Sequence, residues 1–330
     1  MTAGGDAAQR ITFTNHMGPD DVAIALRADV AAGLAAEPKR IPPKWFYDEA
    51  GSELFDKITR LDEYYPTEAE RSALQANADE IVALSGADTV LELGSGSSDK
   101  TRTLLDSFAK AGRLRGYVPF DVSESALRAA ADDLVCRYPS MRLDAVVGDF
   151  DRHLHLLPTT GRRLLAFLGG TIGNYEHGAR SRLLRSIADT LRSGETFLLG
   201  TDLVKDADRL VSAYDDSAGV TAAFNKNVLA VVNRELRADF DLDSFDHVAR
   251  WNADEEWIEM WLRSTAQQVV TVADLDLVVR FAEGEEMLTE ISAKFRREGV
   301  ESELAAVGLE LIGWWTDPDG DYAISLSRKP

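Results

Sequence analysis

The chain is short of cysteine, of long apolar runs and of positive charge. Its single cysteine, Cys136, cannot form an internal disulfide or a cysteine-built zinc site, which favours a reducing compartment and predicts a cytoplasmic location. No apolar run approaches the ~20 residues of a membrane span. Residues 1–10 lack the basic and apolar regions of a secretory signal. We therefore expect no membrane partner.

The deficit of positive charge excludes another class of partner. The 36 lysines and arginines are outnumbered by 56 aspartates and glutamates, so the formal net charge is −20. Such a surface repels phosphate backbones, and we expect no nucleic-acid partner. The 330 residues, 45% hydrophobic and 28% charged, are those of a folded globular protein, which we expect to be a monomer.

The middle of the chain alternates between the apolar periods of strands and helices. A doubly wound α/β sheet is the fold class that this alternation predicts. A hairpin around Asp317-Pro318-Asp319-Gly320 adds an antiparallel edge. The expected strands are 89–93, 117–120, 143–147, 163–168, 196–199, 311–316 and 322–327.

Two other regions follow a different pattern. Residues 40–67 read as a long irregular stretch rich in aromatic residues, and 209–236 read as helical. Residues 247–251, 257–263, 268–273 and 277–281 alternate like the strands of a meander. We expect an inserted, mostly antiparallel α+β domain. The predicted division is a first domain of 70–204 and 294–330, a second of 16–69 and 205–293, and a disordered N-terminus of 1–15.

The sharpest motif is Leu91-Glu92-Leu93-Gly94-Ser95-Gly96-Ser97-Ser98-Asp99-Lys100, which turns from a strand into a helix. Its glycines let the backbone approach a ligand closely. A dinucleotide fingerprint has a third glycine where Asp99 stands, and a carboxylate there repels a pyrophosphate. The motif instead resembles motif I of class I S-adenosylmethionine (SAM) methyltransferases, whose ligand carries cationic groups and no phosphate.

Residues at the ends of two further strands also favour SAM as the cofactor. Asp121 follows the second strand, 25 residues after Gly96, where a carboxylate can accept from both ribose hydroxyls. Asp149 and Phe150 follow the third strand and offer an acceptor for an adenine amino group and a ring to stack on it. The alternative is that Glu92, Asp121 and Asp149 only cap helices and turns, but their order at successive strand ends favours the cofactor.

Segments outside the sheet add a more specific signal. They are Pro42-Pro43-Lys44-Trp45-Phe46-Tyr47-Asp48, Glu63-Tyr64-Tyr65-Pro66-Thr67, Thr171-Ile172-Gly173-Asn174, Ala213-Tyr214-Asp215 and Leu288-Thr289-Glu290-Ile291-Ser292. With these segments and the Gly-Ser-Gly loop, residues 29–328 resemble the bacterial histidine Nα-methyltransferases of ergothioneine biosynthesis. The resemblance implies a class I methyltransferase fold. It also implies three methyl transfers from SAM to the α-amine of L-histidine, giving hercynine and S-adenosylhomocysteine.

The resemblance also assigns roles to residues at matching positions. It implies a catalytic role for Tyr47 beside the amine, next to the Gly169 backbone. Asn174 and Tyr214 would fix the carboxylate and amine end of the substrate. The imidazole would be read by Tyr64, Glu290 and Ser292, with Met260 lining its pocket, and SAM would be held by Gly94, Lys100, Asp121, Asp149 and Phe150. One departure is Gly170, where the family often has serine, so that a hydroxyl contact is missing.

The chemistry of the proposed reaction fits these residue types. Methyl transfer from a sulfonium is an in-line displacement that depends mainly on alignment, and no catalytic base is obligatory. Glu290 can accept from one imidazole N–H while Ser292 or Tyr64 serves the other nitrogen. We predict no metal, because His153 and His155 read as surface histidines without a third ligand.

Taken alone, each of these residues has a simpler explanation. Tyr47, Tyr64, Tyr214 and Met260 would be core residues, Asn174 a left-handed turn residue, Glu290 a strand-end acid and Ser292 a helix N-cap. Two other functions also remain: SAM-dependent N-methylation of another amino acid or small amine, and binding of SAM without catalysis. A nicotinamide oxidoreductase is disfavoured by Asp99.

Overall fold

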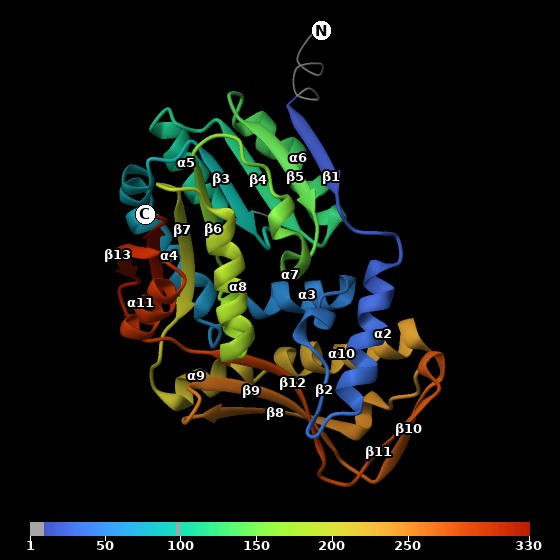
Figure 1. Ribbon diagram of the computed structural model, residues 1–330. Coiled ribbons are helices and arrows are strands. Elements are labelled where there is room, and N and C mark those ends of the chain that lie inside the picture. Colours follow the sequence, from blue (N-terminus) through green and yellow to red (C-terminus); the bar gives the residue numbers. More distant parts are fainter. Residues whose placement is uncertain (1–9, 97–99) are drawn as a thin grey trace.

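The computed structural model describes residues 10–96 and 100–330, and its centre is an eight-stranded sheet. The strands run in the order β1-β5-β4-β3-β6-β7-β14-β13 (Figure 1). They are parallel except for β14, which lies antiparallel between β7 and β13. The bounds are β1 Ile11–Asn15, β3 Thr89–Leu93, β4 Gly116–Asp121, β5 Arg142–Val147, β6 Arg163–Phe167, β7 Thr196–Asp202, β13 Glu310–Thr316 and β14 Tyr322–Arg328. The predicted strands and the terminal hairpin are confirmed.

Helices cover both faces of this sheet. On one face Leu74, Phe108 and Leu134 belong to a buried cluster with alternate strand residues, and each such side chain contributes about 1.5–3 kcal/mol on burial. The other face packs on Leu184 and Leu304. The first layer holds α4 Pro66–Ser85, α5 Thr101–Lys110 and α6 Glu124–Arg137, and the second holds α8 His177–Thr190 and α11 Arg297–Ala306.

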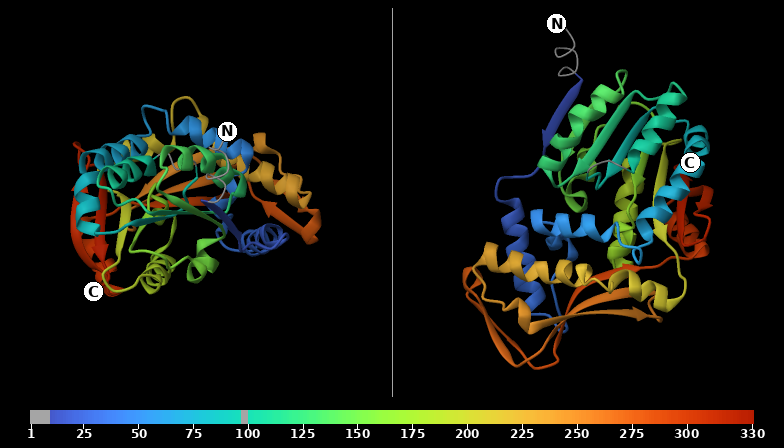
Figure 2. Two further views of the ribbon diagram at one scale, coloured as in Figure 1. Left: turned by 90° about the horizontal axis from the view of Figure 1, so that it is seen from above. Right: turned by 180° about the vertical axis from the view of Figure 1, so that it is seen from behind.

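A second, smaller sheet lies beyond the carboxyl ends of the parallel strands (Figures 1 and 2). Its order is β2-β12-β9-β8, and β10 and β11 form a separate antiparallel ribbon rather than continuing the expected meander. The bounds are β2 Lys39–Arg40, β8 Phe245–Asn252, β9 Trp257–Ser264, β10 Gln268–Val272, β11 Leu277–Phe281 and β12 Glu286–Ala293. Around them lie α2 Asp21–Leu34, α3 Glu49–Ile58, α9 Ala207–Tyr214 and α10 Val220–Leu236, with a core of their own.

Three expectations about local structure are wrong. Residues 11–15 are not disordered but form β1 beside β5, because Ile11 and Phe13 pack against the core of the large sheet. The stretch 40–67 is not irregular throughout, since it contains the short helix η1 (Pro43–Phe46) and α3. The expected strands also lacked β12, where Glu290 was considered only as a possible strand end, because the second half of β12 is buried on both faces and shows no alternation.

Among the helices of residues 10–96 and 100–330, none combines the length and the apolar character that crossing a bilayer requires.

Candidate active site

The ends of β3, β4 and β5 form one side of a large cleft, here called the outer cleft. Gly94 and Gly96 follow β3 with φ of +67° and +47°, a conformation that glycine adopts without strain. Their turn is tied to the end of β4, since Asp121 Oδ2 accepts from the Gly96 N–H at 2.9 Å. Asp121 Oδ1 accepts from the Ser123 N–H at 2.9 Å. Ser97, Ser98 and Asp99 lie outside the described residues.

The outer cleft has a volume of about 1630 Å³ and collects all the residues expected to hold SAM. Phe150, the first residue of the short helix α7 (Phe150–His153), stands against Phe167 with ring centroids 5.6 Å apart. Asp149 caps this helix by accepting from the Asp151 N–H at 2.9 Å. The lining includes Glu92, Gly94, Gly96, Lys100, Asp121, Asp149 and Phe150.

A smaller inner pocket adjoins the outer cleft. The two cavities open into each other, because six residues line both: Tyr47, Phe55, Tyr64, Gly169, Thr171 and Asn174. Deeper in, the lining includes Tyr214, Met260, Glu290 and Ser292, so the inner pocket contains all eight residues expected at the catalytic and substrate positions.

Elements far apart in the sequence supply these side chains. Tyr47 follows η1, Tyr64 precedes α4, and Asn174 ends the short helix η3 (Thr171–Asn174). Tyr214 ends α9. On the small sheet Met260 of β9 lies directly opposite Glu290 of β12, and Ser292, two residues further along, shares the face of Glu290. The pocket thus lies between the carboxyl ends of the large sheet and one face of the small sheet.

Two of the simpler explanations do not hold. Ser292 lies inside β12, five residues before α11 begins at Arg297, and the N-cap of α11 is Arg296, so Ser292 is not a helix N-cap. Asn174 is absent from the residues with positive φ, so it is not a left-handed turn residue. Both side chains face the cavities instead.

Glu290 is buried without a partner. It is 9% exposed, and in the described part of the chain its carboxyl group makes no hydrogen bond. Burial raises its pKa to about 8, although the nearby Lys294 acts in the opposite direction. A buried carboxyl that lacks hydrogen bonds is costly, so the position suits a ligand that brings an N–H donor.

Next to Glu290 lies a hydrogen-bonded cluster that the sequence did not indicate. Tyr214 Oη and Ser292 Oγ are 2.7 Å apart, and Lys294 Nζ donates to each at 2.9 Å. Lys294 also pairs with Asp202 at 2.9 Å. Burial alone would raise the pKa of Asp202, but Lys294 and Lys205 outweigh it and hold this pKa below its usual range.

Glu70, which was not identified from the sequence, makes contacts with residues that line both cavities. It is fully buried on α4 and accepts from the Gly169 N–H at 2.7 Å and from Tyr322 Oη at 2.8 Å. Its other oxygen pairs with Lys100 Nζ at 2.6 Å. Gly170, the position of the departure, has φ of +71°, where a serine would be strained.

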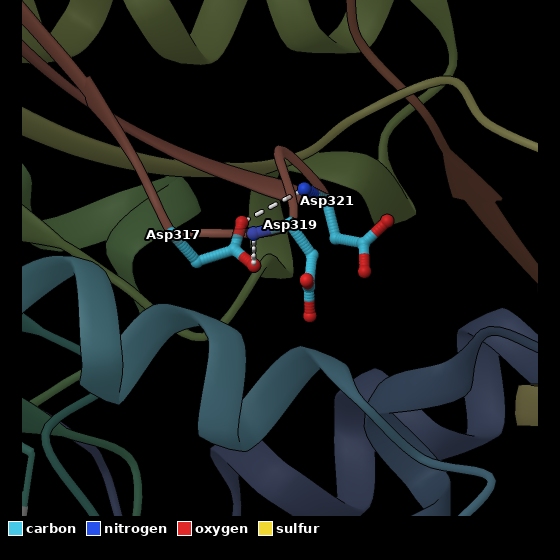
Figure 3. A group of neighbouring side chains, drawn as sticks. All are labelled: Asp317, Asp319 and Asp321. Atoms are coloured by element: carbon cyan, nitrogen blue, oxygen red, sulfur yellow. Dashed lines mark hydrogen bonds between the residues drawn. The ribbon is translucent and has the colours of Figure 1, made fainter.

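Three acidic residues gather in the turn between β13 and β14 (Figure 3). Asp317 accepts from the N–H groups of Asp319 at 3.2 Å and Asp321 at 2.8 Å, and Arg209 pairs with Asp321. These contacts stabilise the turn between the two strands, so the clustering of acidic residues is explained by the structure of the hairpin. His153, expected at the surface, is 8% exposed, and its Nδ1 accepts from the Asp149 N–H at 3.0 Å.

Comparison with known proteins assigns the chain to a family. The family described as "Histidine-specific methyltransferase, SAM-dependent" matches residues 26–329. A histidine N-alpha-methyltransferase of Mycolicibacterium smegmatis is 59% identical over 97% of this chain and 99% of its own length. One from Mycobacterium tuberculosis is 57% identical over 97% of this chain and 100% of its own.

A more distant relative is ergothioneine biosynthesis protein 1 of Schizosaccharomyces pombe, 29% identical over 88% of this chain and 39% of its own length. The strand order of the large sheet, with its antiparallel β14, is that of a class I methyltransferase. The matching family is SAM-dependent, so the methyl donor is SAM. The chain belongs to the family of histidine-specific, SAM-dependent methyltransferases.

Proposed function

We propose that this enzyme transfers three methyl groups from SAM to the α-amine of L-histidine. The products are hercynine and three molecules of S-adenosylhomocysteine, and the reaction is the first step of ergothioneine biosynthesis. One observation carries the choice of substrate: the buried, unpartnered carboxyl of Glu290 lies beside the hydroxyls of Tyr214 and Ser292, in a pocket that opens onto the outer cleft. An imidazole ring offers a donor and an acceptor to match them.

The outer cleft suits SAM. A Cβ built on Gly94 or Gly96 would meet no atom within 4 Å, so the turn is open toward the cleft. In this proposal Asp121 binds the ribose hydroxyls, Asp149 and Phe150 bind the adenine, and Lys100 lies near the amino-acid end. When bound, SAM supplies an electrophilic methyl group.

The junction of the two cavities is where the amine must lie. Tyr47, Gly169 and Asn174 line both, so an amino acid whose ring reaches Glu290 can place its amine at the mouth of the outer cleft. A fraction of an amine with a pKa of about 8 or higher is neutral at working pH, and the free lone pair of this fraction is the nucleophile. Tyr47 orients this amine. Its ring is held edge-on by Phe55 and Phe224, at centroid distances of 5.5 and 5.3 Å.

In this proposal one domain binds mainly the substrate and the other binds SAM. Segments 16–69 and 205–293 form a substrate domain that supplies Tyr47, Tyr64, Tyr214, Met260, Glu290 and Ser292. Segments 70–204 and 294–330 bind SAM and add Gly169 and Asn174. We expect the protein to be a monomer in the cytoplasm. Light scattering of the purified protein tests the oligomeric state.

Incubation of the purified enzyme with SAM and each of the standard amino acids tests the function. Mass spectrometry should show mono-, di- and trimethylhistidine with histidine and little product with the others. Preferred methylation of another amino acid or small amine would support the first alternative function. Binding of S-adenosylhomocysteine without turnover on any acceptor would support the second.

A further inference from the structure

The side chain of Lys294 is completely buried directly behind the inner pocket. Its Nζ donates to Tyr214 Oη, to Ser292 Oγ and to Asp202 Oδ2, each at 2.9 Å. An ammonium group has three N–H donors, and these contacts use all of them. Lys294 therefore has no donor left for a ligand, and any effect on the substrate passes through the two hydroxyls.

The hydrogen-bond capacity of the two hydroxyls shows what they can offer. Together they have two protons and four lone pairs. Lys294 occupies one lone pair on each oxygen, and the 2.7 Å bond between Tyr214 and Ser292 uses one proton and one more lone pair. One proton and one lone pair remain, on different oxygens. The positive charge behind the pair favours use of the proton, because it attracts the electron-rich atom of a ligand.

We propose that Lys294 is a positioning residue that makes the Tyr214–Ser292 pair a hydrogen-bond donor to the substrate ring, so that Tyr214 acts on the ring as well as at the carboxylate and amine end that the family resemblance implies. When Glu290 is ionised, the inner pocket presents one acceptor, the Glu290 carboxylate, and one donor, the hydroxyl of the pair that keeps its free proton. A neutral imidazole has one N–H and one bare nitrogen, and it matches this pair in a single tautomer. The inference rests on the proposed function and adds the protonation state and tautomer in which histidine binds.

The charges around the pair agree with this assignment. Asp202 balances Lys294 and also pairs with Lys205, whose Nζ donates to Tyr65 Oη at 2.6 Å, away from the pocket. Glu290 and Asp202 are the two acidic groups that line the pocket, and within the described residues only Asp202 has lysine partners. Tyr64 and Tyr214 face them as neutral phenols, because burial raises the pKa of each hydroxyl well above its usual range. A doubly protonated ring would bring a second N–H and a positive charge toward Lys294.

Histidine analogues can test the donor directly. The two pyrrolylalanine isomers each keep one ring N–H and replace the other nitrogen by C–H, so one of them preserves the contact with Glu290 and removes only the acceptor. Titration calorimetry at pH 8 with S-adenosylhomocysteine present gives the ratio of dissociation constants between this isomer and histidine. We expect the wild-type enzyme to prefer histidine by about 100-fold, because the analogue leaves a buried donor unpaired.

Variants assign this preference to Lys294. Lys294→Met should reduce the ratio about tenfold or more, and Lys294→Arg should restore part of it. Lys205→Met is the matched control, since it also removes a cation from Asp202 but touches neither hydroxyl, and it should leave the ratio unchanged. Melting curves of each variant separate a local effect from unfolding.

Two results would overturn the inference. One is equal discrimination by the wild-type enzyme and Lys294→Met. The other is a wild-type ratio near one, which decides the matter even if the Lys294 variants fail to fold. Failure of the proposed function looks different, because the wild-type enzyme would then bind S-adenosylhomocysteine but would neither bind nor methylate histidine.

Discussion

A glutamate is buried near each end of the parallel strands, and the pKa values of these two glutamates are shifted in opposite directions. At the amino ends of β6 and β7, Glu195 is 2% exposed and pairs with the equally buried Arg163 at 2.6 Å and with Arg192 at 2.6 Å. These partners outweigh burial and lower the pKa of Glu195 to about 2. Beyond the carboxyl ends, burial raises the pKa of Glu290 to about 8.

The difference separates a structural group from a binding group. Glu195 is satisfied within the chain and stays ionised, so it fixes the start of two strands. Glu290 has no partner in the described residues, so the folded chain carries an unfavourable buried group that a substrate can relieve. Burial alone therefore does not identify a functional carboxylate; burial without a partner does.

The largest expected effect falls at the structural end. Glu195→Ala leaves the Arg163 guanidinium buried without its counter-charge, which should lower the free energy of unfolding by about 3 to 5 kcal/mol. Chemical denaturation measures the loss. Glu310→Ala, on the exposed side of β13, is the control and should change little. A small effect of Glu195→Ala would show that the pair only offsets its own desolvation.

Substitution of Glu290, beyond the carboxyl ends of the strands, should lower activity rather than stability. Glu290→Ala removes the acceptor for the ring N–H, so kcat/KM for histidine should fall about 100-fold or more. Stability should be unchanged or higher, because an unpaired buried group disappears. Steady-state kinetics and melting curves check both. Glu286→Ala, on the same strand but paired with Arg250 and Arg263, should retain turnover; histidine kinetics unaffected by Glu290→Ala would refute the ring assignment.

A third change addresses the outer cleft. Asp121→Ala removes the acceptor proposed for the ribose, which should raise the dissociation constant of S-adenosylhomocysteine about tenfold. Calorimetry measures this constant. Asp144→Ala, on the neighbouring strand β5 and paired with Arg142, serves as the control. An unchanged constant for Asp121→Ala would contradict ribose recognition by this carboxylate.

The pH dependence of stability should have opposite sign at the two glutamates. The folded pKa of Glu195 is depressed, so its contribution is present above the unfolded pKa of about 4.3 and is lost as the pH falls toward about 2. The folded pKa of Glu290 is raised, so its contribution is present below that unfolded value and is lost as the pH rises toward about 8. Each changes stability by at most about 1.4 kcal/mol per pH unit.

Substitution by glutamine isolates the second of these effects. In the absence of substrate, Glu290→Gln should become progressively more stable than the wild-type enzyme between pH 5 and 8, as denaturation at several pH values can show. A difference that is constant over this range would mean that the raised pKa is wrong.

The large sheet could be predicted because its strands are short apolar runs that follow one another in sequence. The residues of the outer cleft could also be predicted, since parallel strands bring their carboxyl ends to one edge, and Gly94, Asp121 and Asp149 each follow such an end. The edge strand β1 could not, because only Ile11 and Phe13 carry its apolar signal.

The residues of the inner pocket could not be predicted from local sequence patterns. Tyr47 and Ser292 come together only after both sheets form, and no local period connects them, so only the family resemblance placed them in one site. Glu70 and Lys294 were missed because a charged residue on a helix or after a strand normally faces water. Their partners lie far away in sequence, as with Glu70 and Tyr322.

The bond from Tyr322 to Glu70 has a consequence for incomplete chains. Tyr322 begins β14, the strand that lies between β7 and β13, and Glu70 in turn holds the backbone of Gly169 at the mouth of the inner pocket. A polypeptide interrupted before this tyrosine would leave β7 with an open edge and the Gly169 loop without its anchor. Premature termination or proteolytic clipping at that hairpin should therefore yield an inactive product rather than a poorly selective methylating fragment.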